Sequence, residues 1–416
     1  MTPSSPRRRV LVLVPRPPYA WGSMDEIIPA LTRTWRRLRR PGTKISFEFL
    51  SRSRSRRWNP PPEDFTDVAL LCLHEFDYER LLARLAASPL AGARWWIHLH
   101  GEPQFGMLFA GNRFIPSRTV YLVASSAERR SLRLTRPFAS CRVLPFPLGA
   151  RVPAPARKSR RKSPPRESAS PRLAYVGRLS EQKNIETVIR AVAMLRDGGR
   201  DCTLELIGRP DTLGDPRFKS DSAWRARGLR ALVSRLGLDR AVAWRGWRDR
   251  RTIERTLDPT AIFVSASLHW DENFGAAAFA ALRRGRRAVL SDWGGHRELA
   301  RLFPGRVALV PVFFDGEGPR VDPARFARAI LRTARKTRPF DGKARPGGWG
   351  PEEAAGRLGK WLEDDGLGAH GRRASGLAKA LSMRTPRDQK AIFESRTDPL
   401  AAFFFKAYGA VFRGDE

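Results

Sequence analysis

Short apolar runs alternate with helix-period segments along most of the chain. In the first half, the runs typical of strands are residues 10–14, 45–50, 68–73, 95–100, 120–124 and 143–146. Apolar residues recur with helical spacing between several of these runs, as in residues 27–38 and 78–87. Because successive positions in these runs are mostly apolar, we expect strands buried on both faces, as in parallel sheets. The alternation predicts a doubly wound α/β domain over residues 1–150.

The pattern stops at residues 151–171 and then resumes. The segment RVPAPARKSRRKSPPRESASP is rich in Pro, Ser and basic residues, so it predicts an exposed linker. Beyond it we expect a second Rossmann-like domain over residues 172–345 and a C-terminal helical segment over residues 346–416. The predicted strands are residues 173–176, 203–207, 242–244, 261–265, 288–290 and 307–310. The predicted helices are residues 185–195, 229–236, 276–284, 323–333, 351–362 and 400–412.

The charge of the chain narrows the class of partner. Lys and Arg number 77 against 42 Asp and Glu, a formal net charge of +35. Such an excess favours phosphates, acidic lipid head groups or nucleic acid, without choosing among them, and an Arg-rich host proteome is the plain alternative. Hydrophobic residues make up 42% of the chain, which argues against disorder.

Cysteine usage and the N-terminus predict the compartment. Cys72, Cys141 and Cys202 are far apart and show no CxxC spacing, so neither a disulfide framework nor a zinc site is predicted. Cys72 lies in an apolar run and is expected in the core. The apolar run at residues 10–14 is too short for a signal peptide, and no run reaches the roughly 18 apolar residues of a membrane span. We therefore expect a cytoplasmic protein, with peripheral attachment to the inner face of the membrane as an extension.

The first segment that could carry chemistry is YVGRLSEQKNIETVIRAVAML, residues 175–195. A strand ends at Val176, Gly177 permits a turn, and a helix begins near Asn184. Arg178 and Lys183 then lie in the loop, at the sheet edge where open α/β sheets bind ligands. Two cations beside a helix N-terminus suit a diphosphate. The alternative is a solvated loop with two incidental basic residues.

The second segment, residues 265–299, carries an acidic loop and two glycine-bearing turns. The loop carries Asp271 and Glu272, of which Glu272 could accept hydrogen bonds from sugar hydroxyls. The N–H groups of residues 274–277, around the Gly275 turn, would face a phosphate at the start of a helix. Gly294–Gly295 begin another helix with a second set of free N–H groups. If the acidic residues only complemented the helix dipole, their charges would be explained but the glycines would not.

Together, the two segments resemble the family 4 (group 1) retaining glycosyltransferases. GRLSEQKNIETVIRAVAML is similar to that family's GRL-x-x-x-K phosphate loop, and ENFG…ALRRG…AVLSDWGGHREL to its E-x7-E region. In the first half, WWIHLHGE and VLPFPLGARV carry a weaker resemblance. The resemblance implies a GT-B fold, with two Rossmann-like domains facing across a cleft. It also implies transfer of a hexosyl group, with retention, from a nucleotide-sugar donor to a glycan or lipid-linked acceptor.

The resemblance also implies roles for matching residues. Arg178 and Lys183 would bind the donor diphosphate and stabilise the leaving nucleotide, so neither a metal nor another cofactor is expected. Glu272 would hold donor-sugar hydroxyls, and His100 would lie near the reacting sugar. The backbone positions that complete the expected binding site are Asn273, Phe274, Gly275, Gly294, Gly295 and, in the loop after the first strand, Gly22.

The chain departs from the family at position 280. The second glutamate of E-x7-E, which binds the ribose in the family, is replaced by Ala280. Losing a charge-assisted hydrogen bond costs about 1.5–3 kcal/mol, roughly ten- to a hundredfold in affinity. Arg287 also replaces the usual proline. These departures favour an alternative: a catalytically weak or inactive GT-B relative that acts as a binding or scaffold protein.

The remaining histidines predict no metal or catalytic cluster. His98 lies on the same strand face as His100 but further from the strand end, so we expect it to be packed. His269 and His296 are expected to form local hydrogen bonds. Metal-ligand spacing is absent from the sequence.

A basic segment at residues 30–42, ALTRTWRRLRRPG, supports two hypotheses. It could lie on an anionic membrane surface, which would then be a further partner. Alternatively, it is an ordinary amphipathic helix packed on the first sheet, and we favour this interpretation. Nucleic acid ranks last as a partner because only the charge and the basic run at residues 157–162 support it.

Overall fold

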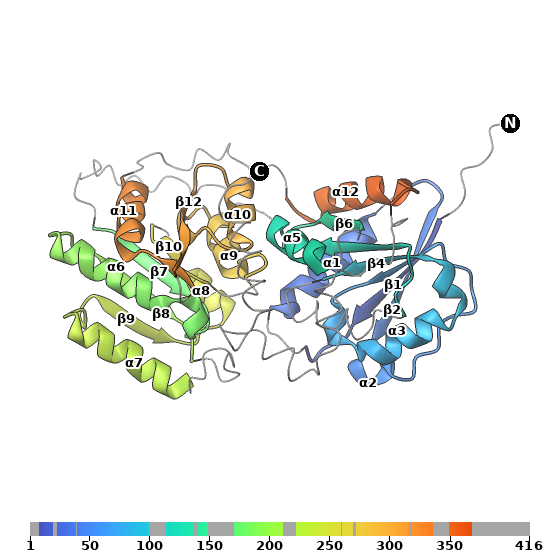
Figure 1. The fold of residues 1–416 in the computed structure, drawn as a ribbon, viewed down its shortest axis with the longest axis horizontal. Coiled ribbons are helices and arrows are strands. Elements are labelled where there is room, and N and C mark those ends of the chain that lie inside the picture. The colour runs from blue at the N-terminus through green and yellow to red at the C-terminus, as the bar shows by residue number, and fades with distance from the viewer. Residues whose placement is uncertain are drawn as a thin grey trace. The chain divides into compact units, whose positions relative to one another are not determined.

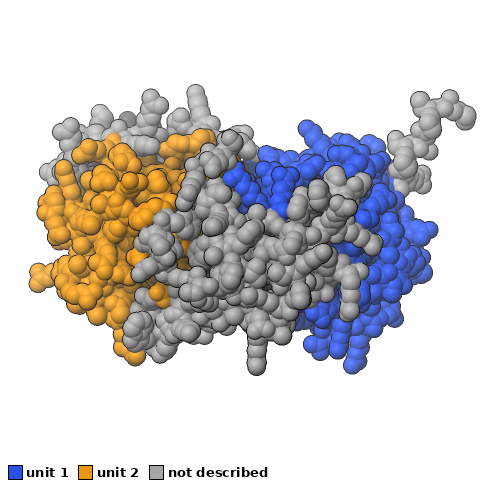
Figure 2. Space-filling model, viewed as in Figure 1, with its two compact units in different colours: residues 1–150, 348–389 blue, residues 151–347, 390–416 orange. Residues whose placement is uncertain are grey.

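The chain folds into two compact units. A computed structural model describes residues 8–19, 23–38, 40–99, 114–135, 140–148, 170–210, 222–258, 260–268, 272–315, 318–335 and 349–367. Unit 1 comprises residues 1–150 and 348–389, and unit 2 comprises residues 151–347 and 390–416 (Figure 2). Each unit contains a sheet with helices packed along it (Figure 1). Within the described ranges, no helix has both the length and the apolar character needed to cross a bilayer.

Unit 1 is built on a parallel six-stranded sheet in the order β2-β1-β3-β4-β5-β6. Its strands are β1 (Arg8–Pro15), β2 (Thr43–Leu50), β3 (Asp67–Leu70), β4 (Arg94–His98), β5 (Thr119–Val123) and β6 (Ser140–Val143). Its α-helices within the described residues are α1 (Met24–Arg37), α2 (Arg52–Ser55), α3 (Tyr78–Ala86), α5 (Ser126–Thr135) and α12 (Pro351–Glu363). Short 3-10 turns occur at η1 (Leu73–Glu75) and η2 (Pro89–Gly92).

Helix α12 follows the second sheet in the sequence but packs against α1 in unit 1. The buried guanidinium of Arg94 donates to the carbonyl oxygens of Leu362 and Asp364, at 2.7 and 2.6 Å. These bonds satisfy carbonyls at the helix C-terminus that have no partner within the helix. Before the helix, the Trp349 indole donates to the Pro145 carbonyl at 3.2 Å. The described part of the C-terminal segment is therefore integrated into the first domain.

Helix α1 contains the first part of the basic segment and is packed. Leu31 and Trp35 are buried, as is Leu38, which ends the helix. On the polar side, Arg37 pairs with Glu352 of α12 at 2.6 Å. The packed-helix interpretation is confirmed, because the apolar side chains that would insert into a membrane are already in the core.

Unit 2 is built on a second parallel six-stranded sheet, in the order β12-β11-β10-β7-β8-β9. Its strands are β7 (Arg172–Val176), β8 (Thr203–Ile207), β9 (Val242–Gly246), β10 (Ile262–Ser265), β11 (Ala288–Ser291) and β12 (Val307–Val310), and an antiparallel hairpin joins β13 (Val312–Asp315) to β14 (Gly318–Val321). Its helices among the described residues are η4 (Glu181–Lys183), α6 (Ile185–Asp197), α7 (Ser222–Arg235), α8 (Arg250–Thr256), α9 (Ala276–Arg283), α10 (His296–Leu302) and α11 (Pro323–Ala334).

Both faces of the second sheet are covered. Leu173 and Tyr175 of β7 belong to a large apolar cluster with residues of α6, α7 and α11. Ala174 and Val176 alternate with them and pack in a second cluster with Leu257. Successive strand residues point to opposite faces, so consecutive apolar residues require cover on both sides. This is the doubly wound arrangement that the sequence predicts.

The predicted strands and most predicted helices are confirmed, with local differences. The structure places β6 three residues earlier than the run at residues 143–146. Strand β3 ends at Leu70 because Cys72 has a φ of 53° and the chain turns into η1. Cys72 itself is buried, as predicted for a core residue. The helix expected after Gly294–Gly295 is confirmed as α10, whereas the sequence prediction missed α2, α5, α8 and the β13–β14 hairpin.

Candidate functional site

The strand order of unit 2 creates a crevice at the carboxyl edge of its sheet. From β7 the chain moves to β8 and β9 on one side, and then returns to β10 on the other side of β7. The loops after β7 and β10 therefore lead to opposite sides of the same strand pair. In open α/β sheets, this reversal of strand order is where ligands bind.

The loop after β7 is held by close backbone contacts. The Tyr175 hydroxyl donates to the carbonyl of Arg178 at 2.7 Å, and the Gly177 N–H donates to the carbonyl of Ile207 at 3.0 Å. A Cβ atom at Gly208 would overlap the Gly177 carbonyl, so only glycine allows these loops to meet. Arg178 is thus carried on a fixed turn.

The same loop is attached to the loop after β10. Asn184 has a φ of 48° at the start of α6, and its side-chain amide donates to the Ala266 carbonyl at 3.2 Å. The Leu268 N–H donates to the Gln182 carbonyl at 2.8 Å. Sequence analysis assigned no role to Asn184. Its type and place gave the signal, since asparagine tolerates left-handed backbone better than most residues.

Lys183 and Glu272 meet across these two loops. The Lys183 Nζ lies 2.7 Å from Oε2 of Glu272, and the two side chains are only 15% and 12% exposed. Two residues that are 89 positions apart are thus joined at the edge of adjacent strands. The sequence predicted both as site residues but did not predict that they pair.

The surroundings keep Glu272 ionised. Burial acts to raise the pKa of its carboxyl, but the charge of Lys183, the nearby His296 ring and hydrogen bonds from Lys183 and Ser267 outweigh it, which lowers the pKa from 4.5 to about 2. At neutral pH the site therefore holds a carboxylate beside an ammonium group. Ser267 is a site residue that sequence analysis missed.

His296 is a buried neighbour of this pair. Its Nδ1 lies 3.0 Å from the Ser291 carbonyl, and since a carbonyl only accepts, that nitrogen donates. Burial lowers the pKa of His296 despite the attraction of Glu272, which favours the neutral ring. The Ser291 hydroxyl donates to the Ser267 carbonyl at 2.6 Å. The prediction of a local hydrogen-bonding role for His296 is confirmed.

The three described site glycines are positions of close contact. A Cβ at Gly294 would overlap the carbonyl of Glu272, and one at Gly275, where φ is 78°, would lie 3.0 Å from the His296 ring. The Gly295 N–H donates to the Glu272 carbonyl at 2.6 Å. That N–H is therefore not free for a phosphate, in contrast to the sequence expectation, because it positions the acidic loop instead.

The comparisons with known proteins agree with this geometry. Residues 156–307 match the family "Glycosyl transferases group 1". The match covers the loops that carry Arg178, Lys183 and Glu272. A search of curated protein sequences gave no match.

Solved structures identify the whole fold as GT-B. Sucrose-phosphate synthase from Thermosynechococcus elongatus aligns with a TM-score of 0.57 at 17% identity, over 86% of this chain and 98% of that protein. HepE from Anabaena, in complex with UDP, aligns with a TM-score of 0.55 at 14% identity, over 85% and 99%. The lipopolysaccharide outer core galactosyltransferase WaaB aligns with a TM-score of 0.53 at 12% identity, over 85% and 99%. The predicted GT-B fold is confirmed.

The matched region includes α9 and the residues just before it, where backbone and side-chain groups differ in exposure. Phe274 is buried against Phe279, with ring centroids 5.2 Å apart, so only its backbone could face a ligand. Ala280 is half-buried on the side of α9 that the core does not cover. The side chain at position 280 is therefore partly open to solvent, and an alanine there supplies no hydrogen-bond acceptor.

Unit 1 adds a cluster of polar residues that the sequence did not predict. At the carboxyl ends of β1 and β3, the environment of Tyr19 includes Cys72 and Glu75, and its pKa is raised by burial and by nearby acidic groups. His74 and Glu75 are buried, with His74 Nε2 lying 3.1 Å from Glu75 Oε1. In the same unit, the indole of Trp35 on α1 donates to Nε2 of buried His98 on β4 at 3.1 Å. This contact confirms a packed role for His98.

Several predicted residues lie outside the described ranges. These are the site residues Gly22 and His100, together with Asp271, His269, residues 151–169 of the predicted linker and the predicted helix at residues 400–412. Among the residues that the structure does describe, no group of three or more His, Cys, Asp or Glu side chains could hold a metal ion.

Proposed function

We propose that this chain is a retaining, metal-independent glycosyltransferase that takes the hexosyl group of a nucleotide sugar. The proposal rests mainly on the Lys183–Glu272 pair at the reversal of strand order in unit 2. A cation and a carboxylate side by side match the two halves of such a donor, a charged diphosphate and a sugar rich in hydroxyls. The group 1 match over the same loops supports this assignment.

Lys183 would bind the diphosphate without leaving Glu272. An ammonium group has three N–H donors, and the bond to Glu272 uses one of them. Arg178, in the same loop, adds a planar guanidinium that suits phosphate oxygens. As the bond between the sugar and the diphosphate breaks, negative charge grows on the leaving nucleotide, and these cations stabilise it.

Glu272 would orient the sugar. Its carboxyl has a pKa of about 2, so at neutral pH it is an acceptor for sugar hydroxyls. Gly294 lies in close contact with its backbone, and the Gly295 N–H donates to its carbonyl. These contacts hold the carboxylate in position before the donor binds. Fixed positioning is valuable because reacting groups must be held within a fraction of an ångström.

The descriptions of two similar structures indicate which donors and acceptors to test first. HepE is described in complex with UDP, and WaaB is a lipopolysaccharide galactosyltransferase, so UDP-sugars and a glycan or lipid-linked acceptor are the first compounds to test. Gly22 and His100 would serve the acceptor side of the reaction. We propose that the protein acts in the cytoplasm.

Ala280 favours a second candidate function. Without the ribose-binding carboxylate, the protein would bind donors weakly and act as a scaffold or binding protein. Turnover of the wild-type protein distinguishes the two, because a scaffold would bind a donor without releasing the nucleoside diphosphate.

A donor screen tests the proposal. The full chain is incubated with UDP-, ADP- and GDP-sugars, and melting temperature and nucleoside diphosphate release are measured. We expect one donor to raise the melting temperature and to be hydrolysed slowly, with loss of both effects in Lys183→Met and not in Lys360→Met, an exposed lysine of α12. Binding without turnover would favour the scaffold function. A folded protein that responds to no donor would contradict sugar transfer and favour the inactive relative.

Retention is tested once a donor and acceptor are known. Proton NMR of the product during the reaction gives the anomeric configuration directly. The same configuration as in the donor supports the proposal, and the opposite configuration would overturn that part of it.

A further inference from the structure

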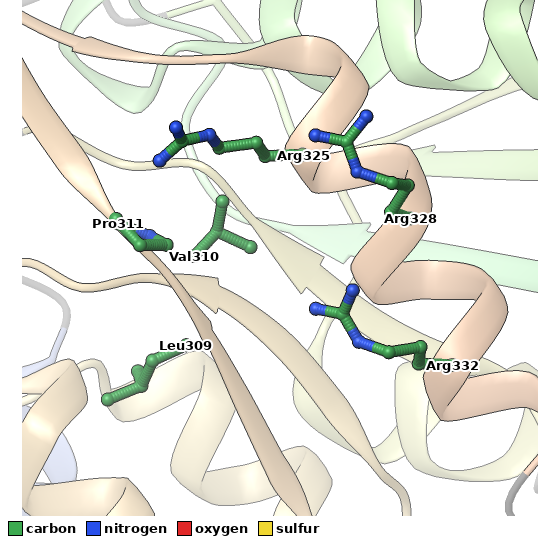
Figure 3. Close-up of a pocket in the computed structure, with 6 residues that line it drawn as sticks. All are labelled: Leu309, Val310, Pro311, Arg325, Arg328 and Arg332. Carbon is green, nitrogen blue, oxygen red and sulfur yellow. The ribbon is translucent and has the colours of Figure 1, made fainter.

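Unit 2 has a basic pocket beside its edge strand. The pocket has a volume of about 210 Å³ and lies between β12 and α11. Its lining consists of Leu309, Val310, Pro311, Arg325, Arg328 and Arg332 (Figure 3). Three of these six residues are arginines, and none is acidic. The pocket is therefore strongly positive over an aliphatic floor.

The arginines are carried on one stripe of a rigid helix. Positions 325, 328 and 332 are spaced by three and four residues, so their side chains share one face of α11. On the opposite side, Phe326 and Ile330 are fully buried in the core of unit 2. The helix cannot turn its basic stripe away without exposing that apolar face.

The positive charge of the stripe is largely unbalanced. Among these arginines, Arg325 pairs with Asp322, with 3.8 Å between Nε and Oδ2. The other oxygen of Asp322 caps the helix by accepting from the Ala324 N–H at 2.8 Å. Within the described part of the chain, Arg328 and Arg332 have no ion-pair or hydrogen-bond partner. Guanidinium groups gathered in this way repel one another until an anion joins them.

Two arginines of unit 2 offer a contrast, because each is paired with a carboxylate. On α6, Arg190 pairs with Glu186 at 2.7 Å, and near its end Arg196 pairs with Asp201 at 2.8 Å. These residues have the same charge as Arg328 and Arg332, but each has its own carboxylate. They provide a matched control for the stripe on α11.

The pocket is separate from the donor site. Glu272 lies in the loop after β10, and β11 separates β10 from β12 in the sheet. The volume is also below the roughly 300–1,000 Å³ typical of pockets for drug-sized ligands. It suits a compact charged group and not a whole nucleotide sugar.

We propose that this pocket is a second anion site that binds a phosphate or diphosphate group. Planar guanidinium forks match phosphate oxygens in pairs, and the aliphatic floor made by Leu309 and Pro311 accommodates the carbon atoms attached to the phosphate. The group could belong to a soluble phosphate ester or to the head group of an anionic lipid. Both sources present the same chemistry to the arginines.

Pyrophosphate is the probe for the soluble source. Its binding is measured by titration calorimetry on the full-length Lys183→Met protein, so that the donor site does not contribute. Adding Arg328→Gln and Arg332→Gln is expected to weaken binding at least tenfold, whereas adding Arg190→Gln and Arg196→Gln, with the same change in net charge, is expected to leave it unchanged. If Lys183 has no role in donor binding, its replacement does not disturb this comparison.

Vesicles test the lipid source. The same pairs of substitutions are compared by sedimentation with phosphatidylglycerol vesicles and with neutral phosphatidylcholine vesicles. If the α11 substitutions weaken binding of pyrophosphate but not of vesicles, the ligand is a soluble phosphate compound. If they weaken binding to the anionic vesicles, the ligand is a lipid head group. If the α11 pair and the α6 pair behave alike with both probes while circular dichroism shows intact folds, the proposal is overturned.

Discussion

Replacing Lys183 with methionine removes the cation that faces Glu272 while keeping most of the side-chain volume. In the folded protein the carboxyl has a pKa of about 2, against an ordinary value of 4.5. One pKa unit corresponds to about 1.4 kcal/mol, so the environment of ionised Glu272 contributes about 3 kcal/mol to stability at neutral pH. Without Lys183 the carboxylate stays buried and loses its main partner, and we expect a loss of about this size.

The dependence on pH has a defined sign. A carboxyl whose pKa is lowered by folding stabilises the protein fully above its unfolded pKa, near 4.5. That contribution is lost as the pH falls through the folded value of about 2. The stability difference between wild type and Lys183→Met should therefore shrink from about 3 kcal/mol at pH 7 to about half of that at pH 3.

Urea unfolding at the two pH values measures this difference. Lys360→Met is the control for removal of an exposed lysine, and it should change stability by less than about 0.5 kcal/mol. Adding Glu272→Gln to Lys183→Met removes the unpaired carboxylate, so the double variant should be more stable than the single one. A Lys183→Met protein as stable as Lys360→Met at pH 7, or equally destabilised at both pH values, would refute the coupling.

Three further predictions follow from the structure. Ala280→Glu should tighten nucleotide-sugar binding about ten- to a hundredfold by titration calorimetry, and unchanged binding would contradict the assigned position of α9. Gly295→Ala should cost about 1–3 kcal/mol, because its Cβ would overlap the Asn273 carbonyl, whereas Gly228→Ala, which meets no atom within 4 Å, should not destabilise; equal effects would argue against the close contact. Burial lowers the pKa of His98 from 6.5 to about 3, so the folded state loses stability as the pH drops below 6.5. His98→Gln should make the loss of unfolding free energy between pH 7 and pH 4 smaller by about 3 kcal/mol. An unchanged pH profile would contradict the packed neutral histidine.

The fold was predictable because it rests on periodicity. Consecutive apolar residues such as Val10–Val14 can be buried only in a strand covered on both faces, and the structure confirms this for β1. Short helices with few apolar residues, such as α2 and α8, carry too weak a period to be recognised. The return of α12 to unit 1 could not be predicted either, because it depends on Arg94 and Trp349 finding partners far away in the sequence.

The candidate site was predictable in its residues but not in its contacts. The types and spacing of Arg178, Lys183 and Glu272 indicated phosphate and sugar chemistry. The sequence did not show that Gly295 donates its N–H to the acidic loop, since that bond depends on how two turns meet in space. For the same reason, the roles of Asn184 and Ser267 emerged only with the structure.

Equilibrium binding of nucleoside diphosphates and their sugars tests the central claim most directly. Titration calorimetry on the full chain should show one site for at least one nucleotide sugar, with affinity lost at least tenfold in Lys183→Met and kept in Lys360→Met. Binding that is equal in all three proteins would contradict the placement of the donor at the Lys183–Glu272 pair. No binding of any donor to the folded wild type would contradict the proposed function itself.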